Sequence, residues 1–270
     1  MKYALMTGGA GGLGGACAVA MAQRGWTVFA ADINDAALAE IRKTENIIPL
    51  KVDITNQQSI DAAHEKVAEI TSALDAVINF AGMHTLCSMI EGNCSDTIEK
   101  MLRINVMGMV RINRSFIDMI FQGHGRIINC SSECGYLKPQ PFNGPYTITK
   151  YAVEAYNESL RRELMFLGIP VIKIQPGSFK TNMHQSATSG FDRLIENTQY
   201  YGKVLRTMKP IMDIELKMAK DPKYIVAAVL NAVEAPHPKI RYRVKNSMML
   251  RSLELIPDSV LDFAYRLVLR

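Results

Sequence analysis

The sequence has no long hydrophobic run and lacks the patterns that mark secreted or metal-binding proteins. No apolar stretch reaches the roughly 18 residues that cross a bilayer, so we expect no transmembrane segment. Five cysteines, an odd number in a chain without a signal peptide, predict reduced thiols and a cytoplasmic protein. Neither Cys130 with Cys134 nor His84 with Cys87 has zinc-site spacing, so we expect no metal.

A strong excess of one charge is also missing. The formal net charge is +5, and residues 201–270 carry thirteen Lys or Arg against seven acids, while the remainder sums to −1. A basic end of this kind fits an acidic lipid surface, a nucleic acid or an ordinary solvated face. Because the charges are scattered and lack aromatic interleaving, we favour the solvated face and expect no nucleic-acid partner.

A glycine-rich turn stands near the N-terminus, between a strand and a helix. The apolar run 3–7 stops at the segment TGGAGGLG, residues 7–14, which has five glycines in eight residues, and residues 13–24 then show helical spacing. Such glycines let backbone amides approach a diphosphate at the N-terminus of a helix. A merely flexible loop is the alternative, and the position between strand and helix argues against it.

An acidic residue follows the second strand. Asp32 closes the apolar run 26–31, eighteen residues after Gly14. A carboxylate there accepts hydrogen bonds from the adenosine ribose and repels a 2′-phosphate, which predicts NAD rather than NADP. No Lys or Arg in the glycine turn offsets that repulsion. The alternative is that Asp32 only caps the next helix.

Apolar strands and helical segments alternate along the chain. Further strands are expected at 47–52, 74–79, 126–130 and 171–175, and helices near 34–44, 56–72, 95–121 and 146–167. This alternation predicts an α/β fold, a single Rossmann-type doubly wound parallel sheet with helices on both faces and ligands at the carboxyl ends of the strands. No segment resembles a linker, so we expect one domain over residues 1–270.

Tyr146 and Lys150 form a potential proton-transfer pair. They lie four residues apart, about one helical turn, so on a helix their side chains share a face. A free tyrosine has a pKa of about 10, and a fixed ammonium beside it is expected to lower that pKa. The spacing alone also arises by chance, so its weight depends on the other motifs.

An ordered set of motifs resembles the short-chain dehydrogenases/reductases. It comprises TGGAGGLG at 7–14, Asp32, VDIT at 52–55, NFAG at 79–82, Asn105, SSECG at 131–135, YTITK at 146–150 and PGSFKT at 176–181. The resemblance covers residues 1 to about 185. It implies an NAD-dependent alcohol dehydrogenase or carbonyl reductase acting on CH–OH groups, and a homodimer or homotetramer.

The resemblance implies catalytic roles for four residues. Ser132, rather than Ser131, would hold the substrate oxygen. Tyr146 would exchange a proton with that oxygen while hydride passes between the substrate carbon and nicotinamide C4. Lys150 would lower the pKa of the tyrosine and bind the nicotinamide ribose, and Asn105 would hold a water for proton relay, with ordinary helix packing as its alternative.

The resemblance also implies cofactor contacts at the strand ends. Asp53 would meet the adenine amine, with helix capping as its alternative. Asn79 and Gly82 would line the adenine-ribose side, and Thr181 would bond the carboxamide. The full set of expected cofactor-binding residues is Gly8, Gly12, Leu13, Gly14, Asp32, Asp53, Ile54, Asn79, Ala81, Gly82, Tyr146, Lys150, Pro176, Gly177 and Thr181.

Three features depart from the family pattern. Phe80 stands where a second asparagine is usual, and Tyr146 follows Ser132 by fourteen residues, one more than is common. The glycine turn also fits the G-x-x-G-x-x-G pattern of the extended, sugar-nucleotide-modifying relatives, against which length and NFAG argue. We expect the chemistry to survive, with a slightly extended loop at KPQPFNGP.

The expected substrate is a hydrophobic alcohol or ketone, retinoid- or steroid-like. Residues 182–220 form the expected substrate-covering segment, whose methionines suit an apolar ligand, although core packing explains them equally well. The motifs from FNGPYTITK onward look most like the retinol and 17β-hydroxysteroid dehydrogenase branch, as does the C-terminal extension, residues 245–270. An amphipathic helix from Asp258 there packs on the domain or touches a membrane surface, and we expect packing.

Two other functions stay open. One is an NADPH-dependent carbonyl reductase, and the other is a dinucleotide-binding sensor without turnover. The complete Asn-Ser-Tyr-Lys set argues against the sensor, because binding alone does not require Ser132 and Tyr146 together. For the enzyme, we favour oxidation, since cells usually keep NAD oxidised.

Overall fold

A seven-stranded parallel sheet forms the centre of the protein. The computed structural model describes residues 1–269, without the side chains of residues 182–188. The strands are β1 (Lys2–Thr7), β2 (Trp26–Asp32), β3 (Ile47–Lys51), β4 (Ala76–Asn79), β5 (Arg126–Cys130), β6 (Val171–Pro176) and β7 (Arg241–Val244). Their order is β3-β2-β1-β4-β5-β6-β7, and all pairings are parallel. The predicted doubly wound α/β fold is confirmed, and β7 adds a strand that periodicity did not predict.

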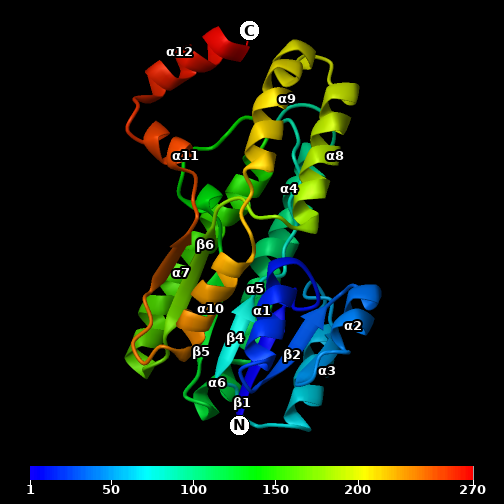
Figure 1. The fold of residues 1–270 in the computed structure, drawn as a ribbon, viewed down its shortest axis with the longest axis vertical. Helices are drawn as coiled ribbons and strands as arrows, with labels where there is room; N and C mark the ends of the chain where they lie inside the picture. Colours follow the sequence, from blue (N-terminus) through cyan, green and yellow to red (C-terminus); the bar gives the residue numbers. More distant parts are fainter. Residues whose placement is uncertain (270) are drawn as a thin grey trace.

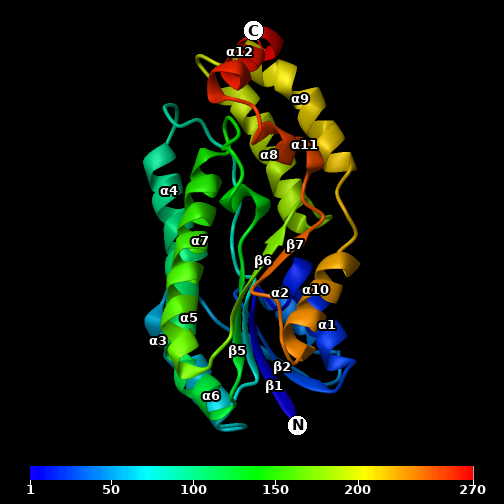
Figure 2. The same ribbon diagram turned by 90° about the vertical axis from the view of Figure 1, so that its left-hand side faces the viewer.

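Helices cover both faces of this sheet (Figure 1). Figure 2 shows α1 (Gly12–Ala22) and α10 (Lys223–Glu234) on one face, and α5 (Met109–Ser115) and α7 (Gly144–Leu164) on the other. The remaining helices are α2 (Asp35–Ile41), α3 (Gln57–Ala68), α4 (Cys94–Leu102), α6 (Ile117–Gln122), α8 (Asn182–Asn197), α9 (Gly202–Lys217), α11 (Met248–Leu253) and α12 (Asp258–Leu269). Helices α8, α9, α11 and α12 gather beyond the carboxyl ends of the strands (Figure 2).

The central strands are buried on both faces, which explains their apolar sequences. Every residue of β4 and β6 is buried, including Asn79 and Lys173. Strands covered by helices on both sides are expected to be apolar throughout rather than alternating, because neither face contacts water. The two cores that result lie one on each face of the sheet.

The long helix predicted at 95–121 is interrupted twice. Helix α4 passes into a π-helical turn at Arg103–Gly108 before α5 begins, and Phe116 leaves helical geometry with φ −109° and ψ 11° between α5 and α6. The phenyl ring of Phe116 is completely buried in the core beneath the sheet, so packing overrides the helical periodicity there. A π-turn inserts an extra residue into a helix and often marks a functional position.

A chain of buried asparagines ties two helices to the central strands. Asn79 Nδ2 donates to Asn113 Oδ1 of α5 at 2.7 Å and to Asn129 Oδ1 of β5 at 3.0 Å. Asn129 Nδ2 donates in turn to Asn157 Oδ1 of α7 at 3.0 Å. Buried amides are costly unless they are paired, so this network fixes α5 and α7 against β4 and β5.

Two glycines in the turn after β1 are required for different reasons. A Cβ on Gly14 would lie 2.2 Å from the carbonyl oxygen of Gly8, so only glycine lets the helix start approach the strand end. Gly12 has φ +56°, which side chains disfavour, and a Cβ there would meet nothing within 4 Å. The turn is thus closely packed at Gly14, where it meets the backbone of Gly8, and open to solvent space at Gly12.

Replacement of Gly14 by alanine should destabilise the protein far more than the same change at Gly11. The added Cβ at Gly14 meets backbone, whereas at Gly11 it meets nothing within 4 Å and the backbone is extended. We expect Gly14→Ala to lower the free energy of unfolding by about 3 kcal/mol or more, as overpacking does, and Gly11→Ala by less than about 1 kcal/mol. Urea unfolding of the protein without ligands measures both, and equal losses would contradict the close approach.

Candidate active site

The predicted site residues lie along one edge of the sheet. Strands β1, β4, β5 and β6 are neighbours, and the glycine turn, NFAG, SSECG and PGSFKT follow their carboxyl ends. Asp32 ends β2, next to β1, and Asp53 follows β3. Parallel strands end at the same edge, which is where open α/β sheets bind ligands. The fold therefore brings distant motifs together at that edge.

Asp32 faces the glycine turn rather than capping α2. Its Oδ2 accepts a hydrogen bond from the backbone amide of Ala10 at 3.3 Å, and its Oδ1 accepts from that of Asn34 at 3.1 Å. The cap of α2 is Asn34, whose side chain accepts from the amide of Ala37. The capping alternative for Asp32 is therefore wrong, and its carboxylate lies beside the turn predicted to bind a diphosphate.

The first turn of α1 suits an anion. Its N-cap, Gly11, provides no side-chain cap, and the turn contains no acidic residue. The unpaired amides and the dipole at a helix N-terminus favour a phosphate group, and the open space in front of Gly12 leaves room for one. The residues here fit a dinucleotide.

The side chain of Asp53 bonds within its own loop, whereas that of Ile54 is buried in the core. Asp53 Oδ1 accepts from both the amide and the hydroxyl of Thr55, at 2.8 and 2.7 Å, while Asn56 caps α3. The capping alternative for Asp53 is thus wrong as well. The side chain of Ile54 is buried in the core, so a contact with a cofactor there would come from the backbone.

The side chain of Asn79 does not face the predicted ribose position. It is almost fully buried, and its amide is bound by the asparagine network and by the hydroxyl of Thr7, which donates to Oδ1 at 3.3 Å. A contact of Asn79 with the adenine-ribose side would therefore come from its backbone, and the predicted cofactor contact stays a prediction. Asn79 instead supports the central strands, a task that Phe80 cannot perform because its ring packs on the apolar core.

The remaining cofactor-side residues occupy the same edge. Leu13 packs partly buried against the core at the start of α1, and Ala81 and Gly82 follow β4. Pro176 ends β6, and the amide of Gly177 donates to Val244 of β7 at 3.0 Å. Thr181 takes the N-cap position of α8 without a side-chain cap hydrogen bond.

Tyr146 and Lys150 lie one turn apart on α7, as predicted. Lys150 Nζ lies 5.5 Å from the centroid of the Tyr146 ring and donates to the backbone carbonyl of Cys130, the last residue of β5, at 3.1 Å. The ammonium thus sits over the face of the phenol ring and is held at the strand end. Lys150 is itself buried.

Ser132 is placed to act with Tyr146. Its hydroxyl accepts from the backbone amide of Cys134 at 3.1 Å and lies close enough to the phenol of Tyr146 to oppose the rise in the pKa of that phenol. Ser131 is almost fully buried, and its hydroxyl finds no hydrogen-bond partner among the described residues. A Cβ on Gly135 would lie 2.7 Å from that hydroxyl. This geometry favours Ser132 over Ser131 as the reactive serine.

The pKa of Tyr146 is shifted in the direction opposite to the sequence-based expectation. Burial raises the pKa of the phenol, the thiols of Cys134 and Cys130 add to the rise, and the hydrogen bond with Ser132 acts against it. Burial also lowers the pKa of Lys150. Desolvation therefore outweighs the neighbouring ammonium, which is bound to a backbone carbonyl above the ring.

Asn105 connects the π-turn to the segment after β4. Its Oδ1 accepts from the backbone amide of Met83 at 2.8 Å, and its Nδ2 donates to the Met83 carbonyl at 2.9 Å and to Thr149 Oγ1 at 3.1 Å. The side chain is thus a clamp between two backbone groups and α7. The predicted water-holding role remains a prediction.

Sequence reasoning missed two residues of this site. The imidazole of His84 packs edge-on against Tyr146, with ring centroids 4.5 Å apart, and the only signal was its place two residues after NFAG. Glu133, next to Ser132, is buried, and its Oε2 accepts from the amide of Ser247, the N-cap of α11, at 2.6 Å. No local pattern indicates that contact, because it joins residues far apart in sequence.

The C-terminal extension packs on the active-site loop. Tyr265 of α12 donates to Gln140 Oε1 at 2.6 Å, and Leu261 is buried beside it on α12. Most other apolar residues of α12 are exposed, among them Val260, Phe263, Leu267 and Val268. The predicted helix exists and packs on the rest of the chain through a few contacts.

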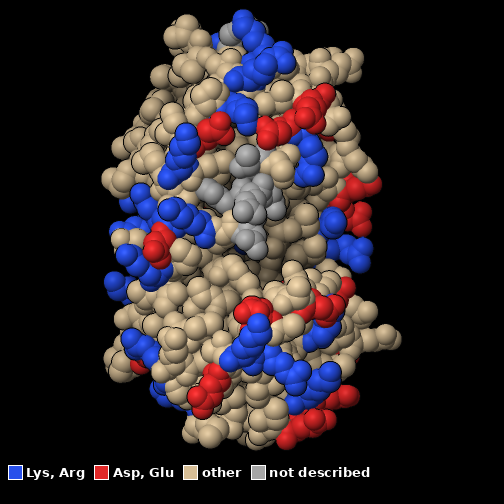
Figure 3. Space-filling model, turned by 45° about the vertical axis from the view of Figure 1, so that its right-hand side comes forward, with Lys and Arg blue, Asp and Glu red and all other residues tan. Residues whose placement is uncertain are grey.

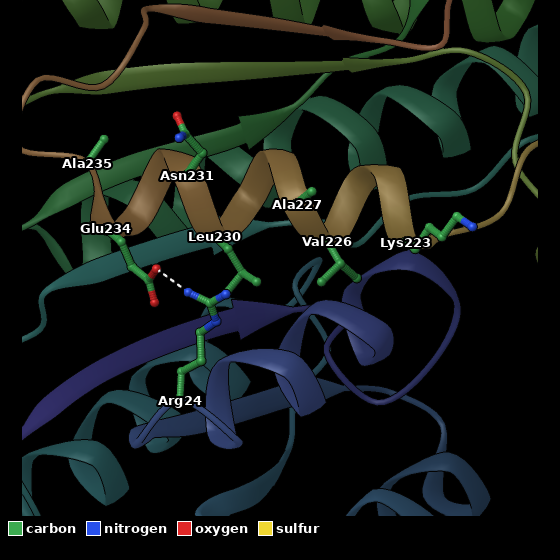
Figure 4. Close-up of a pocket in the computed structure, with 8 residues that line it drawn as sticks. All are labelled: Arg24, Lys223, Val226, Ala227, Leu230, Asn231, Glu234 and Ala235. Carbon is green, nitrogen blue, oxygen red and sulfur yellow. Dashed lines mark hydrogen bonds and ion pairs between the residues drawn. The ribbon is translucent and has the colours of Figure 1, made fainter.

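A surface hollow elsewhere is unrelated to these residues. It lies between the end of α1 and α10, with Val226 and Leu230 in its wall, and an ion pair of 2.7 Å between Arg24 and Glu234 spans it (Figure 4). None of the predicted site residues lines it. On the face in Figure 3, basic and acidic side chains are interspersed, as on an ordinary solvated surface.

Among the described residues, no helix combines the length and apolar character needed to span a bilayer. In the same part of the chain, no group of three or more His, Cys, Asp or Glu side chains could hold a metal ion. All five cysteines are free thiols.

Comparison with known proteins identifies a family. The model of the short chain dehydrogenase family matches residues 2–191. Retinol dehydrogenase 16 of Mus musculus is 30% identical over 89% of this chain and 80% of its own length, and the NADPH-dependent 3-dehydrocapnine reductase of Ornithobacterium rhinotracheale is 28% identical over 97% and 95%. The crystal structure of a short-chain dehydrogenase from Streptomyces avermitilis is similar with a TM-score of 0.76, at 24% identity over 97% of this chain and 93% of that one.

Replacement of Glu133 by glutamine should flatten the dependence of stability on pH. Burial raises the pKa of Glu133 to about 7, with Glu215 adding to the rise and the amide of Ser247 opposing it. The folded state therefore binds this proton more tightly than the unfolded chain, whose glutamates titrate near 4.3. The free energy of unfolding should fall as pH rises from about 4.5 to 7, by about 3 kcal/mol at most, and Glu133→Gln should remove that fall.

Chemical unfolding at a series of pH values measures this effect. The matched control is Glu65→Gln, which changes an exposed glutamate on α3. A pH profile of Glu133→Gln that still parallels the wild type between pH 5 and 7 would contradict the buried carboxyl.

Proposed function

The chain belongs to the short-chain dehydrogenase family, and we propose that it is an NAD-dependent oxidoreductase. It transfers hydride between nicotinamide C4 and the carbon of a hydrophobic alcohol or ketone, retinoid- or steroid-like. The observation that carries the proposal is the arrangement of three side chains at the end of β5. Tyr146 lies within reach of the Ser132 hydroxyl and beneath the ammonium of Lys150, beside a glycine turn that fits a dinucleotide.

Ser132 and Tyr146 share the substrate oxygen in the proposed reaction. The serine hydroxyl donates a hydrogen bond to that oxygen and holds it against the phenol. In reduction the phenol of Tyr146 gives its proton to the oxygen, and in oxidation the phenolate takes the proton of the alcohol. The raised pKa of Tyr146 keeps the phenol protonated near neutral pH, which is the form that donates a proton during reduction. Oxidation requires the phenolate, so its rate should increase as the pH rises.

Lys150 acts on the site in two ways. Its ammonium lies over the Tyr146 ring, where it favours any negative charge that develops on the phenol during oxidation. Its donors also face the strand end where the nicotinamide ribose is expected, so it serves binding as well as proton transfer. A bound nicotinamide supplies the hydride acceptor or donor, which no side chain provides.

Asp32 supports NAD as the cofactor. Its carboxylate lies at the end of β2, bonded to the amide of Ala10, where an adenosine ribose beside the glycine turn would meet it. A 2′-phosphate would there face an uncompensated negative charge, since the turn contains no Lys or Arg.

The substrate class follows from the relatives and from the covering helices. The similarity to retinol dehydrogenase 16 supports an apolar alcohol, as do the methionines Met208 and Met212 of α9. Residues 182–220, which form α8 and α9 beyond the strand ends, are the proposed substrate cover. We further propose a cytoplasmic homodimer or homotetramer.

A second candidate is an NADPH-dependent carbonyl reductase. Two observations favour it, the relative whose name is NADPH-dependent 3-dehydrocapnine reductase and the protonated state of Tyr146 near neutral pH, which suits reduction. Asp32 argues against the phosphate of NADPH, so cofactor preference decides between the two candidates.

Replacement of Tyr146 by phenylalanine should abolish turnover and leave cofactor binding intact. The change removes only the proton-exchanging hydroxyl, so we expect kcat to fall by about a thousandfold or more. Nicotinamide absorbance with retinoids, hydroxysteroids and aliphatic secondary alcohols measures turnover, and nicotinamide fluorescence measures binding. Tyr224→Phe, at an exposed tyrosine on α10 outside the proposed substrate cover, is the control and should behave as the wild type. Unchanged turnover in Tyr146→Phe would overturn the mechanism.

Cofactor choice tests the role of Asp32. The wild type should prefer NAD to NADP, and Asp32→Ala should reduce that preference about tenfold or more, because the repulsion of the 2′-phosphate is removed. Asp35→Ala, at an exposed aspartate in the first turn of α2, is the control and should keep the preference. The ratio of kcat/KM for the two cofactors measures the outcome, and a wild-type preference for NADP would favour the reductase.

A further inference from the structure

His84 belongs to the candidate active site although no motif contains it. The residue follows NFAG by two positions, and its ring meets Tyr146 edge-on with centroids 4.5 Å apart and an interplanar angle of 78°. Its Nε2 lies 3.0 Å from Asn143 Oδ1. The imidazole therefore contacts both the catalytic tyrosine and the residue that precedes α7.

Asn143 continues the contact toward the catalytic serine. Its Nδ2 donates to the thiol of Cys134 at 3.6 Å, and the backbone amide of Cys134 donates to Ser132 Oγ at 3.1 Å. Since the oxygen of the Asn143 amide then faces His84, Nε2 of the imidazole carries the donated proton. One chain of contacts thus runs from His84 to Ser132, and a ring contact runs from His84 to Tyr146.

The position of Asn143 explains why its side chain can connect His84 to Cys134. Asn143 occupies the N-cap position of α7, yet its side chain makes no cap hydrogen bond. Asparagine at an N-cap position usually accepts a hydrogen bond from the first turn of the helix. Here the side chain of Asn143 instead connects His84 to Cys134. The loop that it closes separates Ser132 from Tyr146 by fourteen residues. A connection of that length does not by itself determine the relative position of the two residues, so a contact that bridges it has a structural consequence.

The imidazole is neutral where it lies. Burial lowers the pKa of His84 and the ammonium of Lys150 lowers it further, while the bond to Asn143 acts against them. The groups around it that titrate or carry charge are Tyr146 and Lys150 of α7, and beyond them the thiols of Cys130 and Cys134 and the carboxyl of Glu133. A neutral ring can donate from Nε2 without placing a second cation beside Lys150.

We propose that His84 is a positioning residue that sets the catalytic tyrosine and serine at their working separation. It does so mainly by donating to Asn143, which reaches the Ser132 turn through Cys134, while its ring contact with Tyr146 makes the smaller contribution. The inference rests on the proposed oxidoreductase function. It adds a residue from the segment after β4 to a reaction that the motifs assign to β5 and α7.

Three substitutions separate the hydrogen bond from the ring contact. His84→Phe keeps an aromatic ring and removes the donor, His84→Gln keeps a donor at the position of Nε2 and removes the ring, and Asn143→Ala removes the acceptor without removing a helix cap. We expect His84→Phe and Asn143→Ala each to lower kcat about tenfold, since a misplacement of ångström size costs that much or more. His84→Gln should restore kcat to within about threefold of the wild type.

The double variant His84→Phe, Asn143→Ala should be no slower than either single variant, because both remove the same contact. KM for the cofactor should stay within about threefold in all of them, since the glycine turn is untouched. His64→Phe is the matched control, because His64 likewise packs on a ring, that of Phe116, and bonds a side-chain oxygen, that of Asp118, away from the site. It should leave kcat unchanged.

Wild-type kcat in His84→Phe, effects that multiply in the double variant, or a glutamine variant as slow as the phenylalanine variant would each overturn the proposal. Nitrogen-15 NMR of the histidines tests the contact without turnover, since the His84 signal should show a neutral ring protonated at Nε2 and should shift in Asn143→Ala. An unchanged signal would overturn the proposal even in an active enzyme. A wild type without turnover, or an active Tyr146→Phe, would instead remove the proposed function.

Discussion

The buried ammonium of Lys173 determines where the catalytic helix lies. Lys173 belongs to the fully buried strand β6, and its Nζ binds Glu154 at 2.8 Å and Glu158 at 2.6 Å, both on α7. The hydrogen bond from Lys173 lowers the pKa of Glu158 to about 2, so this carboxylate is ionised at any ordinary pH. Loss of one partner from a buried pair costs about 3–5 kcal/mol. Residues 146, 150, 154 and 158 follow at intervals of four, so the contact that fixes two carboxylates also turns Tyr146 and Lys150 toward the end of β5.

Two opposing effects meet at Tyr146, and their balance explains the state of the phenol. An adjacent ammonium favours the phenolate, whereas burial favours the neutral phenol, and burial prevails here. The ammonium of Lys150 lies over the face of the ring and donates a hydrogen bond to the backbone carbonyl of Cys130. One of its N–H groups is therefore directed to the backbone and not to the phenol oxygen. The spacing of two residues shows which side chains share a face of a helix. The degree of burial depends on elements that are distant in sequence, so the direction of the pKa shift of Tyr146 can be determined only from the fold.

The same distinction separates what local pattern predicted from what it missed. The glycine turn, the acid after β2 and the strand ends are properties of single segments, and they were predicted correctly, as was the pairing of Tyr146 with Lys150. The hydrogen bonds of the Asn79 side chain, the π-turn at Asn105 and the contact of α12 with Gln140 depend on partners from other segments, and local pattern did not reveal them. His84 shows the limit most clearly, because its partners lie fifty-nine or more residues away and no periodicity marks it.

The candidate site joins a part of the chain that the family model matches to a part that it does not match. The family match ends at residue 191, after β6 and within α8. It therefore covers the first six strands, the glycine turn and α7, but not β7, α9, α10, α11 or α12. The two parts meet at consecutive residues, because Ser132 lies beside Tyr146 and Glu133 binds the start of α11 at Ser247. The proposed reaction site and the contact with the C-terminal helices are thus one peptide bond apart, yet they depend on different segments. Segments outside the family match can differ between relatives while the motifs keep their geometry, which is why motifs that indicate a reaction leave the substrate open.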